Sequence, residues 1–103
     1  MEFKEYQEQA GKTIKDESKN YAYLVLGLCS EAGEVADKFK KHVRDGKPLY
    51  AENVAKELGD VLWYVAMLSE QLGYSLDEVA NMNLDKLFSR KDRGKIEGSG
   101  DNR

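Results

Sequence analysis

Two long helical patterns, separated by a short breaking segment, constrain the fold of this chain more than any other feature. Residues 21–44 and residues 51–72 each repeat apolar side chains at steps of three and four, the spacing of one helix face. Asn20 is suited to cap the first of these helices. Gly46 favours a helix C-cap, and Pro48 prevents the helix from continuing. Because so short a connection favours antiparallel neighbours, the sequence predicts an antiparallel helical pair.

Two shorter helices complete the expected fold. Residues 2–16 carry apolar side chains at helical spacing, and a capping box at Ser75–Glu78 opens a last helix that runs to about Lys91. No segment has the pattern of a strand. The prediction is therefore an all-α, four-helix bundle in a single domain over residues 1–103, with about 94–103 as a flexible, glycine-rich tail.

The third helical segment is apolar or aromatic at every position from residue 61 to residue 68. A helix that is apolar on all sides is expected to be buried on all sides. One chain of 103 residues can hardly surround such a helix by itself. We therefore expect a partner subunit to cover its outer face, in a dimer or tetramer assembled through this helix.

Composition narrows the class of protein. The net charge of −3 argues against duplex nucleic acid or an anionic membrane as the main partner. No apolar run approaches the roughly 20 residues of a membrane span. Cys29 is the single cysteine, which excludes an internal disulfide and favours a reducing compartment. These features predict a small, soluble, cytoplasmic domain.

Two pairs of acidic residues lie beside the apolar stripes of the long helices. Around the axis of the first long helix, Glu31 and Glu34 are rotated to one side of the apolar stripe. Glu57 and Asp60 are rotated in the same sense from the stripe of the second long helix. On antiparallel neighbours, acidic faces rotated in the same sense lie on one side of the pair, so the four carboxylates can converge. Gathered carboxylates repel one another and resist ionising. A hard cation such as Mg2+, with Mn2+ as a substitute, resolves the repulsion.

A plainer interpretation of the acidic residues stays open. Acid pairs three residues apart are common on solvated helix faces, and Glu34 with Lys38 has the spacing of an ordinary ion pair. The neighbouring glycines favour the functional interpretation, because each mid-helix glycine costs about 1 kcal/mol relative to alanine. Gly27, Gly33 and Gly59 therefore predict a close approach to the backbone near the acids.

Basic and amide side chains follow one face of the last helix, at Asn83, Lys86, Arg90 and Arg93. Cations beside flexible backbone amides suit phosphate oxygens. The alternative is a solvated basic face that is favoured near a helix C-terminus. Together with a carboxylate metal site, the basic face would describe a pocket for a polyphosphate.

The acidic segments resemble a known signature. Ser30-Glu31-Ala32-Gly33-Glu34, followed by Glu57-Leu58-Gly59-Asp60, is similar to the EExxE and ExxD motifs of the MazG-like, all-α nucleoside triphosphate pyrophosphohydrolases. The ending Gly98-Ser99-Gly100-Asp101-Asn102-Arg103 resembles short, phage-like members of that family. Ser30 replaces the first glutamate of EExxE, which leaves open whether one or two metal ions bind.

The resemblance implies Mg2+-dependent cleavage of a nucleoside triphosphate between its α and β phosphates, giving a monophosphate and pyrophosphate. It also implies a dimer or a tetramer with pockets near the subunit interface. The expected metal ligands are Glu31, Glu34, Glu57 and Asp60, and the first two are the expected catalytic residues that orient or deprotonate water. The expected substrate-binding residues are Lys38, Tyr64, Asn83, Lys86, Arg90, Gln7 and Trp63.

Two alternatives to this function remain at the level of the sequence. One is a non-catalytic helical protein that dimerises through the third helix and binds a partner protein. The other is a related pyrophosphatase that acts on a phosphoribosyl nucleotide. For Trp63, simple packing at an interface is the stronger alternative to a role in base binding, and the preferred base is not determined by the sequence.

Overall fold

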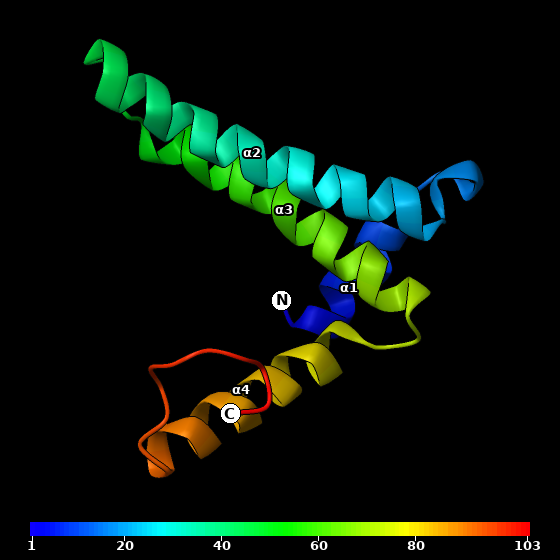
Figure 1. Ribbon diagram of the computed structural model, residues 1–103. Helices are drawn as coiled ribbons and strands as arrows, with labels where there is room; N and C mark the ends of the chain where they lie inside the picture. Colours follow the sequence, from blue (N-terminus) through cyan, green and yellow to red (C-terminus); the bar gives the residue numbers. More distant parts are fainter.

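The computed structural model describes all 103 residues and contains helices but no strand. The all-α fold and the number of long helices are therefore confirmed (Figure 1). The elements, in chain order, are α1 (Phe3–Gly11), the short 3-10 turn η1 (Asp16–Ser18), α2 (Tyr21–Asp45), α3 (Ala51–Gln71) and α4 (Leu76–Asp92).

The antiparallel pair of α2 and α3 forms the main body of the fold (Figure 1). The Asn20 side chain accepts a hydrogen bond from the backbone N–H of Tyr23 at 2.8 Å, as expected of the predicted N-cap. Gly46 ends α2 in the left-handed conformation, with φ 66°, as predicted. Both ends of α2 thus follow from local chemistry.

The first helix is shorter than predicted, because it ends at Gly11 and not near residue 16. The Thr13 backbone N–H bonds to the Ala10 carbonyl at 2.9 Å, and the Thr13 hydroxyl donates to the same oxygen at 2.7 Å. That carbonyl is the acceptor that a continuing helix would need. Gly11 has a low helix propensity, so the chain leaves the helix here.

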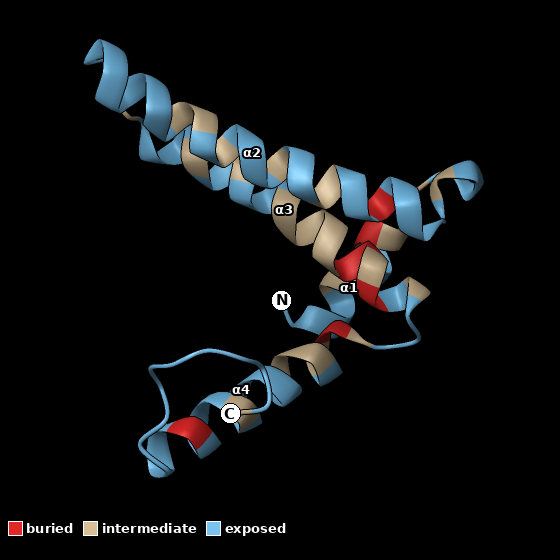
Figure 2. Cartoon of the chain, in the orientation of Figure 1, coloured by how far each residue is buried: buried red, intermediate tan, exposed pale blue.

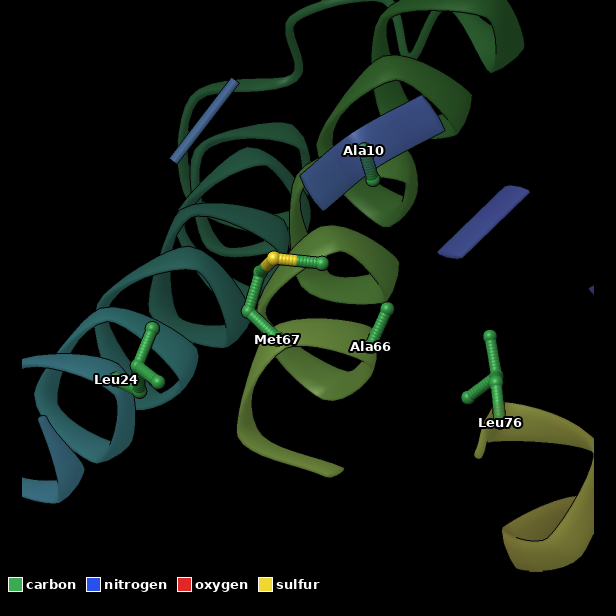
Figure 3. Packing of buried hydrophobic residues seen from close by; sticks show 5 residues of the cluster. All are labelled: Ala10, Leu24, Ala66, Met67 and Leu76. Carbon is green, nitrogen blue, oxygen red and sulfur yellow. The ribbon is translucent and has the colours of Figure 1, made fainter. Parts of the chain in front are cut away.

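The fully buried core is small and lies where all four helices meet. Figure 3 shows its apolar members, Ala10 of α1, Leu24 of α2, Ala66 and Met67 of α3, and Leu76 of α4. The radius of gyration is 16.3 Å, whereas a compact domain of this length would have about 13 Å. The chain is therefore extended and leaves much apolar surface uncovered.

Residues 61–68, the stretch of α3 that is apolar on all sides, are buried or half-buried within one chain. Outside this stretch, Leu58 of α3 is 53% exposed and the C-cap residue Leu72 is 57% exposed. The other helices of the chain cover only part of the α3 surface, and the partner subunit expected to cover the rest stays a prediction. Along α2, the predicted stripe is buried at Leu24 but exposed at Val43. Figure 2 shows that the buried residues of α2 and α3 lie toward the end of the pair where α1 packs.

The last helix diverges from the α2–α3 pair (Figure 1). Its predicted capping box is confirmed, because the Glu78 backbone N–H bonds to the Ser75 hydroxyl while the Glu78 carboxylate accepts from the Ser75 backbone. Beyond this start, most of α4 is exposed (Figure 2). The exposed residues include the apolar side chains of Met82, Leu87 and Phe88. None of the helices combines the length and the hydrophobicity that a membrane span requires.

Candidate metal centre between α2 and α3

Three carboxylates from facing helices converge on the side of the pair that the sequence indicated. Glu31 comes from α2, and Glu57 and Asp60 come from α3. One carboxylate oxygen of each lies within 4.8 Å of the others. The convergence arises because acids three residues apart share a helix face, and the antiparallel pair turns the two acidic faces to one side.

The fourth predicted ligand, Glu34, is exposed and is not among the carboxylates that meet within 4.8 Å. Its negative charge nevertheless affects the pKa of Glu31 in the cluster. Partial burial is the largest cause that raises the pKa of Glu31, and the negative charges of Asp60, Glu57 and Glu34 raise it further. The raised pKa of Glu31 therefore reflects burial first and the neighbouring negative charges second.

One cation lies beside the cluster. The Lys38 Nζ is 3.8 Å from a Glu57 carboxylate oxygen, and both side chains are about one-quarter to one-third exposed. At that distance the pair is a loose one. Lys38 thus offsets part of the cluster's charge while its remaining donors stay available.

An aromatic side chain closes the gap between the helices next to the acids. A Cβ atom added at Gly27 would lie 2.1 Å from a Tyr64 ring atom, so the ring lies against the bare backbone of α2. The close approach predicted from the glycines therefore occurs at Gly27. Gly33 and Gly59 have no neighbouring atom within 4 Å of such a position in this chain.

Tyr64 belongs to an aromatic group. Its ring centroid lies 4.9 Å from that of Trp63, edge to face, and 6.3 Å from that of Tyr23. The hydroxyl of Tyr23 is the largest cause that raises the pKa of Tyr64, followed by burial and the charges of Tyr23, Glu31 and Asp60. Tyr64 therefore borders the acidic cluster, as predicted from its place one turn after Asp60.

The remaining predicted base-pocket residues have packing partners within the chain. The Trp63 indole N–H donates to the Thr13 hydroxyl at 2.8 Å. The Gln7 amide donates to the Ala66 carbonyl at 3.1 Å and accepts from the Leu76 backbone at 2.9 Å, which joins α1, α3 and α4. Both side chains support the helix packing, so their role toward a substrate stays a prediction.

A tyrosine of α1 lies near enough to the cluster to respond to its charge. Burial is the larger cause that raises the pKa of Tyr6, and the charge of Asp60 adds to it. In the sequence, the place of Tyr6 on an apolar helix face indicated core packing only, and Tyr6 does pack against the core. Its nearness to Asp60 depends on where α1 crosses α3, which local sequence does not determine.

The basic residues of α4 lie apart from this cluster within one chain, because α4 leaves the α2–α3 pair (Figure 1). Lys86 and Arg90 instead contact Asp101, near the end of the chain, at 2.7 Å and 3.2 Å. Asn83 lines a hollow on the same face, together with Lys86 and Asp101. The role of Asp101 was missed from the sequence, where an isolated acid in a glycine-rich tail was the one available sign.

The donor set fits a hard divalent cation. All three converging groups are carboxylates, and no histidine or cysteine joins them. Oxygen donors suit Mg2+, Mn2+ or Ca2+ and not the softer metals that prefer nitrogen or sulfur. Acidic side chains on facing helices are also a recurrent way to build a metal site in a helical bundle.

Comparisons with known proteins agree with this arrangement. The family of the MazG nucleotide pyrophosphohydrolase domain matches residues 19–94, which include every converging carboxylate. The Gene 37 protein of Mycobacterium phage L5 is 49% identical over 92 residues, covering 85% of this chain and 81% of that protein. No solved structure matches the chain. The chain therefore belongs to the MazG family of nucleotide pyrophosphohydrolases, which makes it a hydrolase that acts on phosphoric anhydride bonds.

Proposed function

We propose that this protein is a Mg2+-dependent nucleoside triphosphate pyrophosphohydrolase, which cleaves between the α and β phosphates to give a monophosphate and pyrophosphate. The observation that carries the proposal is the meeting of Glu31, Glu57 and Asp60 within 4.8 Å. Mg2+ takes oxygen ligands and keeps coordination positions for water and phosphate. Mn2+, which shares that preference, would substitute for it.

The metal site would be formed by Glu31, Glu57 and Asp60, with Glu34 joining them by rotation of its exposed side chain. A bound Mg2+ lowers the pKa of a coordinated water and neutralises charge on phosphoryl oxygens. Ser30, in place of the family's first glutamate, offers a neutral hydroxyl. We therefore favour one tightly held ion over two.

Glu31 and Glu34 are the proposed catalytic residues. A general base must lie within reach of the water that it activates. Glu31 is one of the three converging carboxylates, so it lies next to any water held at the cluster. We infer that Glu31 accepts a proton from the attacking water, while Glu34 orients that water from the exposed side of α2.

The substrate-binding residues would divide between two segments. Lys38 is beside the acids and only loosely paired with Glu57, so its ammonium can turn toward a phosphate. Tyr64 offers a ring and a hydroxyl to the sugar or base at the same place. Asn83, Lys86 and Arg90 belong to α4, so we propose that they serve the acidic cluster of another copy. Gln7 and Trp63 would act indirectly, by supporting the helices around the site.

We propose that the protein self-associates through α2 and α3, as a dimer or tetramer. Exposed small or apolar side chains recur along α2 at steps of four and three, at Val25, Cys29, Ala32, Ala36, Phe39 and Val43. On α3 and its C-cap, apolar side chains recur every seven residues, at Leu58, Val65 and Leu72. Repeats of this spacing form the seams along which helices pair. A second copy would cover the apolar surface that one chain leaves open.

A panel of nucleoside triphosphates tests the proposed reaction. Each nucleotide is incubated with Mg2+, and the products are separated as monophosphate plus pyrophosphate or diphosphate plus phosphate. We expect the first pair of products, and we expect no turnover in EDTA. Diphosphate and phosphate would contradict cleavage between the α and β phosphates. A phosphoribosyl nucleotide is included in the panel, because its preferential hydrolysis would identify the related pyrophosphatase instead.

A further inference from the structure

The C-terminal residues fold back onto α4 in a defined loop. Gly98 and Gly100 adopt positive φ angles of 116° and 87°, which turn the chain back (Figure 1). The Arg103 guanidinium then donates to the carbonyls of Lys95, Gly100 and Ile96, at 2.8 to 3.1 Å. We name residues 95–103 the C-terminal loop.

Two contacts hold this loop to the basic face of α4. The Arg93 guanidinium donates to the Arg103 carbonyl at 2.7 Å, and the Asp101 side chain accepts from two further cations. The Lys86 Nζ donates to Oδ1 of Asp101 at 2.7 Å, and an Arg90 guanidinium nitrogen donates to the same oxygen at 3.2 Å. Arg90 also donates to the Asp101 carbonyl at 2.6 Å. Two cationic donors from successive turns of the helix therefore converge on a single carboxylate oxygen.

The loop also covers Arg90. The Arg90 side chain is only 7% exposed, although its neighbours in α4, Leu87 and Lys91, are exposed to solvent. Beyond its start, where Leu76 joins the core, α4 diverges from the α2–α3 pair (Figure 1), so those helices do not provide this cover. The C-terminal loop provides the cover, because Asp101 of this loop contacts Arg90.

Converging Lys and Arg donors suit a phosphoryl oxygen as well as a carboxylate oxygen. Asp101 is itself 77% exposed, so its ion pairs are screened by solvent and weak. A polyphosphate offers more oxygens and more negative charge than one carboxylate. It can therefore replace the Asp101 carboxylate at these donors, whereas Asp101 is favoured by its tether to the chain and by the bond from Arg90 to its carbonyl.

We propose that Lys86 and Arg90 form an oxyanion site for a polyphosphate, and that Asp101 occupies this site as an internal competitor until the anion displaces it. Displacement frees the C-terminal loop and uncovers Arg90. The polyphosphate class rests on the proposed function, since a nucleoside triphosphate and pyrophosphate would be the substrate and product. The competition itself depends only on the contacts between α4 and the loop.

Binding of inorganic tripolyphosphate, measured by calorimetry without metal, tests the competition. An internal competitor blocks its site for part of the time. The apparent affinity for another ligand is then the intrinsic affinity multiplied by the fraction of time that the site is free. Because the ion pairs of Asp101 are weak, Asp101→Asn should tighten binding by roughly two- to tenfold. Asp101→Glu keeps the charge and should bind about as the wild type does. Adding Lys86→Gln should reverse the gain.

Glu97→Gln is the matched control, because it removes the same charge from the same loop at an exposed side chain without an ion pair. Equal affinities in Asp101→Asn and Glu97→Gln would overturn the competition, as would weaker binding in Asp101→Asn. Absence of binding to both wild type and Asp101→Asn would overturn the site itself.

Hydrogen exchange gives a second readout. Saturating tripolyphosphate should speed amide exchange in residues 95–103 of the wild type, and unchanged exchange with bound anion would contradict displacement. Both measurements are independent of catalysis. If the nucleotide panel shows no hydrolysis while Asp101→Asn still tightens anion binding, the proposed function fails and the oxyanion site stands.

Discussion

The α2–α3 pair and the α4 segment differ in which parts of the chain they pack against. The two long helices lie against each other and bring three carboxylates together between them. The last helix leaves that body, exposes apolar side chains such as Phe88, and finds a partner for Arg90 in its own C-terminal loop. Acidic and basic groups suited to metal and polyphosphate therefore belong to separate parts of one chain. This division explains why we expect a complete site to need a second copy.

The largest effect is expected at the acidic cluster. Glu57→Gln removes one converging carboxylate charge and should lower kcat by roughly 100-fold or more, since metal and phosphate both depend on that charge. Steady-state kinetics with Mg2+ measures this loss of kcat. Glu52→Gln is the matched control on the same helix, because Glu52 is exposed and lies outside the cluster. Equal losses in both variants would remove Glu57 from the site.

Self-association is expected to respond strongly to a charge on the free face of α3. Leu58→Lys introduces an ammonium where a partner helix should pack, and should weaken association by about 2 kcal/mol or more, roughly 30-fold in dissociation constant. Sedimentation over a range of protein concentrations measures this dissociation constant. Gln9→Lys adds the same charge on the exposed surface of α1 and should leave the mass unchanged. An unchanged oligomer in Leu58→Lys would place the interface elsewhere.

Glycine substitutions should separate a filled position from an open one. Gly27→Ala forces a methyl group against the Tyr64 ring and should lower the free energy of unfolding by about 1–3 kcal/mol. Gly33→Ala meets open space in the chain and should raise it by up to about 1 kcal/mol through helix propensity. Urea unfolding measures both. A destabilising Gly33→Ala would indicate that another chain approaches α2 at that residue.

The smallest effect is expected at the start of α4. Ser75→Ala removes the hydroxyl of the capping box and should cost about 1 kcal/mol of helix stability. Because α4 stands apart from α2, faster hydrogen exchange should be confined to α4 and the loop. Equal acceleration in α3 would show that α4 and the helical pair unfold together, which would remove the contrast between the two regions.

The parts of the fold that could be predicted from the sequence depend on local chemistry. Asn20 and Gly46 bound α2, and Ser75 with Glu78 opens α4, because caps act within a few residues. The helical phase of the acids also sufficed to predict that Glu31 and Asp60 lie on one side of the pair. Periodicity and capping need no knowledge of distant segments.

Most of the parts that could not be predicted depend on distant contacts. The end of α1 at Gly11 is an exception with local causes, and it was missed because Ile14 continues the apolar spacing beyond that point. Helical phase gives no register along the axes, so it could not show that Glu34 lies outside the group within 4.8 Å. The pairing of Arg90 with Asp101 depends on how the glycines of the loop turn the chain. The flexibility expected of residues 94–103 stays a prediction.

Metal binding tests the central claim most directly. Mn2+ is titrated into wild type, Glu57→Gln and Glu52→Gln, and free ion is followed by electron paramagnetic resonance, with Mg2+ added afterwards as a competitor. We predict saturable binding that Mg2+ displaces in wild type and Glu52→Gln, and binding at least tenfold weaker in Glu57→Gln, as expected when a carboxylate ligand is lost. Equal binding by all three proteins would contradict a metal centre built from Glu31, Glu57 and Asp60.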